Sequence, residues 1–196
     1  MNESKPRDPD AIDPKTTGLR CRVRIGSADG ILAVVPHLLG FRPSNSLVVL
    51  GIGGPHARIR LAFRYDLPEP PDDELAADMA EHAVSVLGRQ HLDMAVAVGY
   101  GPGTAVTPVM DVVAPALRKA GIGIQDMLRV EGGKYWSYVC QDTGCCPPDG
   151  TPFDTEAHPA SAALAAAGLT VLAGRSELAE TLAPVTEAVA PMQAAA

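Results

Sequence analysis

The apolar run from Leu47 to Ile52 (LVVLGI) sets the strongest limit on the fold of this chain. A strand that is apolar at every position, and not only at alternate ones, is typical of a strand buried on both faces. The residues after it, Gly53, Gly54 and Pro55, predict a tight turn, and residues 57–65 predict a second strand. The sequence therefore predicts a β-hairpin inside a covered sheet.

Strand and helix patterns alternate along the rest of the chain. Strands are predicted at 19–25, 47–52, 57–65, 93–98, 124–130, 135–140 and 170–172. Caps and helical periodicity predict helices at 27–39, from 72 onward, at 107–119, at 158–167 and from 176 onward. Because hairpins are mixed with helical crossovers, we expect an α/β fold with a mixed sheet of about six or seven strands and helices mainly on one side.

The domain organisation follows from where a core can be buried. A chain of 196 residues is long enough for one domain, and we predict a single α/β domain over residues 19–183. Residues 1–18 are polar and rich in proline, so we predict a disordered N-terminal arm. Residues 184–196 are predicted to be a flexible C-terminal tail.

Charge and hydropathy exclude several classes of protein. The formal net charge of −7 argues against a general nucleic-acid-binding protein, which needs a basic surface. No run reaches the roughly 18 apolar residues of a membrane-spanning helix, and the N-terminus has no apolar signal region. We therefore expect a cytoplasmic protein without membrane contact, whose cysteines are reduced.

The segment 134–154 (KYWSYVCQDTGCCPPDGTPFD) is the most unusual of the chain, since it holds the only tryptophan and three of the four cysteines. Cys140, Cys145 and Cys146 form a C-x4-C-C pattern. As a zinc site they would need a fourth ligand, such as His158 or Asp142, and the spacing matches no standard zinc finger.

Three other interpretations of these thiols stay open. Cys140 could form a structural or redox-active disulfide with Cys145 or Cys146. One thiol could be a catalytic thiolate with a lowered pKa, which needs a nearby cation or helix N-terminus. The thiols could also be small apolar side chains in a loop that packs on Trp136 and Tyr138.

Three stretches of the chain resemble a known family. They are ADGILAVVPHLLGFRPSNSLVVLGI (28–52), VGYGP (98–102) and DMLRVEGGKYWSYVCQDTGCCPPDGTPFD (126–154). With the elements between them, they resemble an actinobacterial family of the DUF 4192 type, a domain of unknown function. The resemblance implies no activity. It implies a short member that lacks the usual helical C-terminal extension, which is either a functional unit by itself or needs a partner chain to supply the missing part.

A glycine-rich turn follows the strand at 93–98. Gly99, Gly101 and Gly103 lie between this strand and a helix, where backbone N–H groups and the helix dipole suit a phosphate or carboxylate. Pro102 removes one donor, and a lone glycine pattern is weak. The alternative is a tight turn from strand to helix.

Arginines alternate with apolar residues along two of the predicted strands. On the strand at 57–65, the apolar face opposite the arginines is predicted to carry Ile59, Leu61, Phe63 and Tyr65. If the two strands are neighbours, one face of the sheet carries Arg20, Arg22, Arg24, Arg58, Arg60 and Arg64. That face would bind an acidic partner, a small anionic ligand or a nucleic-acid backbone, or would be a plain solvated face.

These patterns favour a cytosolic binding or regulatory module over an assembled catalytic site. The cysteine-rich loop is the predicted functional surface, with Tyr135, Trp136 and Tyr138 as contacts to a protein partner or small ligand. The alternative is a thiol-dependent enzyme or redox protein that uses Cys140 with Cys145 or Cys146.

Overall fold

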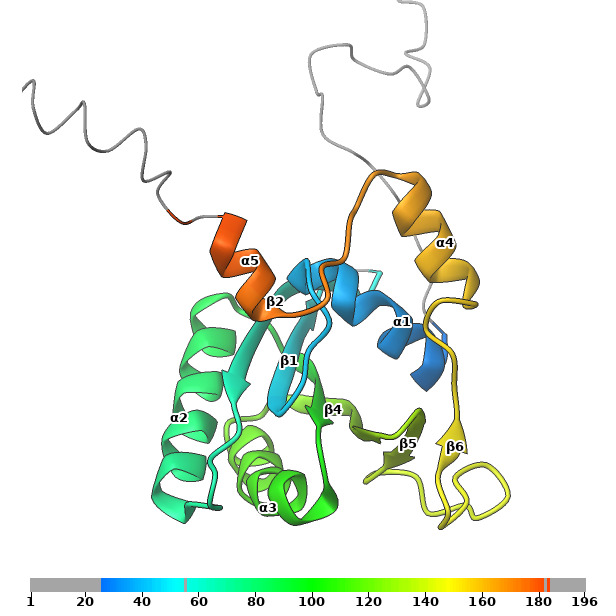
Figure 1. Ribbon diagram of the computed structural model, residues 1–196. Coiled ribbons are helices and arrows are strands. Elements are labelled where there is room, and N and C mark those ends of the chain that lie inside the picture. Colours follow the sequence, from blue (N-terminus) through cyan, green and yellow to red (C-terminus); the bar gives the residue numbers. More distant parts are fainter. Residues whose placement is uncertain (1–25, 55, 182, 184–196) are drawn as a thin grey trace, which may run out of the picture.

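The computed structural model describes residues 26–54, 56–181 and 183 (Figure 1). The strands are β1 (Ser46–Gly53), β2 (Arg58–Asp66), β3 (Met94–Tyr100), β4 (Gly123–Glu131), β5 (Lys134–Ser137) and β6 (Thr151–Pro152). The helices are α1 (Ala28–Leu39), α2 (Asp73–Arg89), α3 (Gly103–Lys119), α4 (Pro159–Ala166) and α5 (Arg175–Thr181).

The strands form one mixed sheet of six, in the order β2-β1-β3-β4-β5-β6. β3 and β4 are parallel and are connected by α3, whereas every other neighbouring pair of these strands is antiparallel. The predicted α/β class, the mixed sheet and both hairpins are confirmed. Among the described helices, none has both the length and the apolar character needed to cross a membrane.

Helices cover the sheet on both faces (Figure 1). The two longest, α2 and α3, pack on one face around Met79, Val106 and Met110. On the other face, Leu32 and Val35 of α1 pack on β1, β3 and β4, and α4 packs in turn against α1. Because β1 lies between the two layers of helices, all eight of its residues are buried, as the continuous apolar run predicts.

Clear capping contacts mark the C-terminus of α1 and the N-terminus of α2. α1 ends at Gly40, which adopts the left-handed conformation (φ 80°) and donates its N–H to the Pro36 carbonyl. The Asp72 carboxylate begins α2 by accepting from Glu74 N at 2.9 Å and Leu75 N at 3.0 Å. Leu75 does not belong to the buried stripe of α2, since it is 43% exposed. Its neighbour Ala76 is buried instead, because the apolar stripe is rotated by one residue.

A β-bulge in β2 changes the predicted faces of that strand. Gly51 pairs with Leu61 and Ile52 pairs with Ile59, so Arg60 has no partner on β1. One extra residue reverses the alternation. Ile59 therefore packs toward α1, whereas Leu61, Phe63 and Tyr65 pack toward α2 and α3. The prediction of one shared face is wrong for Ile59.

Several boundaries also differ from the predictions. α3 begins at Gly103, four residues earlier than the periodicity indicated. The predicted strand at 170–172 is a single bridge between Phe41 and Leu172, and β6 was not expected. The predicted arm (1–18), the strand at 19–25 and the tail (184–196) lie outside the described residues.

Candidate functional site

The cysteine loop, residues 138–150, connects β5 to β6 at the edge of the sheet. A tight turn folds it back on itself. The carbonyl of Asp142 accepts from Cys145 N at 3.1 Å and from Cys146 N at 2.7 Å. The Asp142 carboxylate accepts from Gly144 N at 2.9 Å. This turn returns the two adjacent cysteines to Cys140, whose own N–H donates to Ser137 Oγ at 3.1 Å.

The loop brings all three predicted thiols together. The sulfur atoms of Cys140, Cys145 and Cys146 lie within 4.8 Å of one another, and none of the three is in a disulfide. Cys145 is exposed, and the other two are half-buried. Aspartate followed two residues later by glycine (Asp142, Gly144) is a turn signal from which this closure could have been predicted.

His158 does not join the group of sulfur atoms. It is the N-cap of α4, and its Nδ1 accepts from Ala160 N at 3.1 Å. Its Nε2 lies 3.8 Å from Asp29 Oδ2 at the start of α1. The structure therefore separates this histidine from the thiols with which the sequence could have combined it.

Cys140 and Cys146 differ in their affinity for a proton. A hydrogen bond from the Cys146 thiol lowers the pKa of Cys140, and a second bond from the Asp142 N–H lowers it further. The same donation to Cys140 raises the pKa of Cys146. Cys140 is therefore the first of this pair to become a thiolate, the form that reacts as a nucleophile and binds metals.

Trp136 anchors the far end of the loop. Its Nε1 donates to the Pro148 carbonyl at 2.9 Å. Gly150 lies against the ring so closely that a Cβ there would be 2.6 Å from two ring carbons. On β4, the Arg129 guanidinium carbon lies 3.7 Å from the ring centroid, because Arg129 and Trp136 are cross-strand partners. Trp136 is thus a support for the loop.

The other two predicted aromatic contacts have different surroundings. Tyr135 packs edge to face on Phe153, with ring centroids 5.9 Å apart. Burial raises its pKa, and the charges of Asp29 and the nearby thiols add to that effect. Tyr138 donates to or accepts from Thr107 Oγ1 at 2.8 Å. It is 36% exposed and the adjacent Val139 is 39% exposed, so these two form the surface beside Cys140.

The glycine turn is built mainly for packing. A Cβ on Gly99 would lie 2.3 Å from Val106 Cγ1, so this position lets α3 approach the sheet. The Gly101 N–H donates to the Val130 carbonyl at 2.9 Å and is not free for a ligand. Gly103, at the start of α3, lies near Arg129. Sequence reasoning missed Arg129, although the hairpin at 131–134 predicts that it faces Trp136.

The arginines of β2, which were predicted to share one face of the sheet, do not do so. Strand register and the bulge at Arg60 place Arg58 and Arg64 on opposite faces of β2. Arg64 is largely buried and pairs with Asp66 at 2.5 Å. This hydrogen bond lowers the pKa of Asp66, together with the charges of Arg64 and Arg175. Arg20, Arg22 and Arg24 lie outside the described residues.

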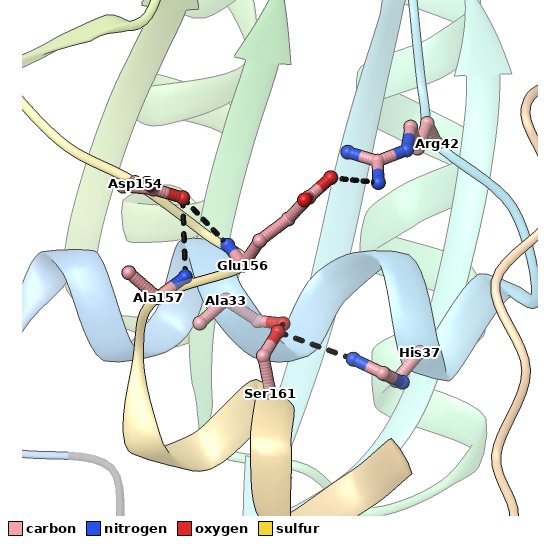
Figure 2. Close-up of polar contacts among 7 residues, drawn as sticks. All are labelled: Ala33, His37, Arg42, Asp154, Glu156, Ala157 and Ser161. Carbon is pink, nitrogen blue, oxygen red and sulfur yellow. Dashed lines mark hydrogen bonds and ion pairs between the residues drawn. The ribbon is translucent and has the colours of Figure 1, made fainter.

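The chain after the loop is attached to α1 and to the segment that follows α1 by polar contacts (Figure 2). Ser161 Oγ donates to the Ala33 carbonyl at 3.2 Å and lies 3.2 Å from His37 Nε2. Glu156 forms an ion pair with Arg42. The Asp154 carboxylate accepts from Glu156 N at 2.9 Å and orders the approach to α4. These contacts fix the C-terminal end of the segment that carries the thiols.

Comparison with known proteins gives a family and no function. A family model described as "Domain of unknown function (DUF4192)" matches residues 29–196. No curated protein matches the chain.

Proposed function

The chain belongs to the DUF4192 family, a domain of unknown function, and we propose from its geometry that it is a cytoplasmic zinc-binding module centred on the cysteine loop. The observation that carries this proposal is the group of three sulfur atoms within 4.8 Å of one another. Tetrahedral zinc with Zn–S bonds of about 2.3 Å separates its sulfur ligands by about 3.8 Å. The sulfur atoms therefore need to move by no more than about 1 Å to bind the ion.

The loop supports thiolate ligands in two ways. The Asp142 turn brings the adjacent cysteines back to Cys140, and a backbone N–H bonds to the Cys140 sulfur. In a reducing cytoplasm the thiols stay free, and zinc binding releases their protons. The ion would replace the hydrogen bonds among the thiols with three Zn–S bonds and make the loop rigid.

A rigid loop would present Tyr138 and Val139 to what the module binds. These are the exposed large apolar side chains next to Cys140. A scattered exposed apolar residue needs no explanation, but here two lie beside the thiol group. The net charge of −7 argues for a protein or small-molecule partner over nucleic acid.

Metal content and mass test this function. The protein is purified with reductant, its intact mass is measured by mass spectrometry under native and denaturing conditions, and its zinc content is quantified. We expect one zinc ion per chain, lost on denaturation and lost in Cys140→Ser, Cys145→Ser and Cys146→Ser. His158→Asn, which keeps a good N-cap, is the matched control and should retain the metal. Metal-free protein with four free thiols after incubation with zinc would contradict the proposal.

A redox protein is the second candidate, favoured by the hydrogen bond between the Cys146 thiol and the Cys140 sulfur. A peroxide would oxidise this pair to a disulfide: the two thiols lose two electrons and two protons, and hydrogen peroxide is reduced to two water molecules or an alkyl hydroperoxide to an alcohol and one water molecule. The mass would fall by two hydrogen atoms and return with reductant. Uniformly unreactive thiols under peroxide and alkylating agent would exclude this candidate.

A further inference from the structure

We propose that the zinc site is open, with three loop thiolates and a fourth position that takes a neutral nitrogen donor from a small molecule, of which imidazole is the simplest. The inference rests on the proposed zinc-binding function and goes one step further, since it names the class of ligand.

The side chains that could complete the site have other partners. His158 caps α4 through Nδ1, and its Nε2 faces Asp29. The Asp142 carboxylate accepts from Gly144 N within the turn. Among the described residues, no histidine, aspartate or glutamate joins the three sulfur atoms. Because zinc in proteins is almost always four-coordinate, the fourth ligand then comes from outside the described residues, and we assign it to water or another molecule.

The site is accessible from solvent. Cys145 is exposed, and Tyr138 and Val139 beside Cys140 are more than a third exposed. The loop also lies at the edge of the sheet, where the two-residue β6 is the last of the described strands (Figure 1). A small molecule can therefore reach the ion without a rearrangement of the core.

The net charge of the zinc ion and its three thiolates favours a neutral ligand at the fourth position. Three thiolates and one Zn²⁺ sum to a charge of about −1, and a fourth thiolate or a carboxylate would make it about −2. The carboxylate of Asp142 adds negative charge next to Cys140. Imidazole nitrogen is a common zinc ligand and adds no charge. The same site would disfavour small carboxylates by like-charge repulsion.

Cobalt substitution tests the ligand separately from the metal. Co²⁺ reports its coordination through visible d–d bands, and each thiolate adds to a charge-transfer band in the near ultraviolet. We expect imidazole to shift the visible bands with saturation while the charge-transfer intensity stays constant. Acetate should leave the spectrum unchanged. His158→Asn should respond to imidazole as the wild type does, since this histidine is not a ligand.

Three results would overturn the open site. A spectrum insensitive to imidazole would show that the fourth position is filled from within the chain. A charge-transfer band that loses about a quarter of its intensity in Cys21→Ser would identify the remaining cysteine as a fourth thiolate. A band that rises by about one third with 2-mercaptoethanol would show that the site prefers a thiolate. If Co²⁺ does not bind at all, the proposed zinc-binding function fails together with this inference.

Discussion

Replacing Gly99 with alanine should destabilise the protein by pushing α3 away from the sheet. Gly99 lies in β3, and a Cβ there would be 2.3 Å from Val106 Cγ1 and 3.2 Å from Met110 Cε. Val106 is fully buried, and a helical valine has one strongly preferred rotamer, so the side chain cannot turn away. Overpacking of this kind costs about 1–3 kcal/mol. At about 2–4 °C per kcal/mol for a protein of this size, Tm should fall by about 2–12 °C.

A double-mutant cycle with Val106→Ala tests the cause. The free energies of unfolding are measured in urea for the wild type, both single variants and the double variant. Val106→Ala removes the obstructing methyl groups, so Gly99→Ala should cost almost nothing in that background, with a coupling of about 1–3 kcal/mol. Gly103→Ala is the control, since a Cβ there meets Arg129 only at 3.7 Å. Equal costs of Gly99→Ala in both backgrounds would refute the packing explanation.

Two further predictions concern polar contacts. Ser161→Ala removes the bonds to the Ala33 carbonyl and His37, and should lower the free energy of unfolding by about 1 kcal/mol in urea, whereas exposed Ser176→Ala should change it by less than about 0.5 kcal/mol. The pKa of Asp66 is lowered by Arg64, so its contribution to stability is present above the unfolded pKa and is lost as pH falls through the folded pKa. Stability measured from pH 7 to pH 3 should therefore fall less for Asp66→Asn than for the wild type, and an equal fall in both would show that the pair contributes nothing.

The parts of the fold that local patterns determine were predictable. The apolar run of β1, the turn after it and the cap at Asp72 each depend on residues that lie next to one another in the sequence. The hairpin of β4 and β5 follows from its glycine turn in the same way. Each of these local signals favours one conformation over its alternatives.

Other features depend on partners that the sequence does not reveal. The bulge at Arg60 could not be predicted, because β2 alternates equally well in either register until it pairs with β1. β6 pairs over only two residues, and its place depends on Trp136 and Lys134 holding the loop. From the sequence, Gly99 is compatible both with a ligand-binding loop and with a packing contact. The close approach of α3 in the structure identifies the packing contact.

The candidate site was predictable in its residues but not in its geometry. The C-x4-C-C pattern permits a metal site, a disulfide or a packed loop, and only the Asp142 turn brings the three sulfur atoms within 4.8 Å. The sequence also offered His158 as a ligand, whereas the fold uses it to cap α4. Tyr135 and Trp136, which were predicted as contacts to a partner, pack against Phe153 and the loop backbone, and the sequence did not reveal these neighbours.

X-ray absorption at the zinc edge tests the central claim most directly, because it counts the sulfur ligands. The protein is purified with reductant, loaded with one equivalent of zinc and freed of excess metal. We predict three sulfur atoms at about 2.3 Å and one nitrogen or oxygen at about 2.0–2.1 Å. A zinc ion with fewer than three sulfur ligands, or protein that retains no zinc, would contradict the claim that Cys140, Cys145 and Cys146 form a metal site.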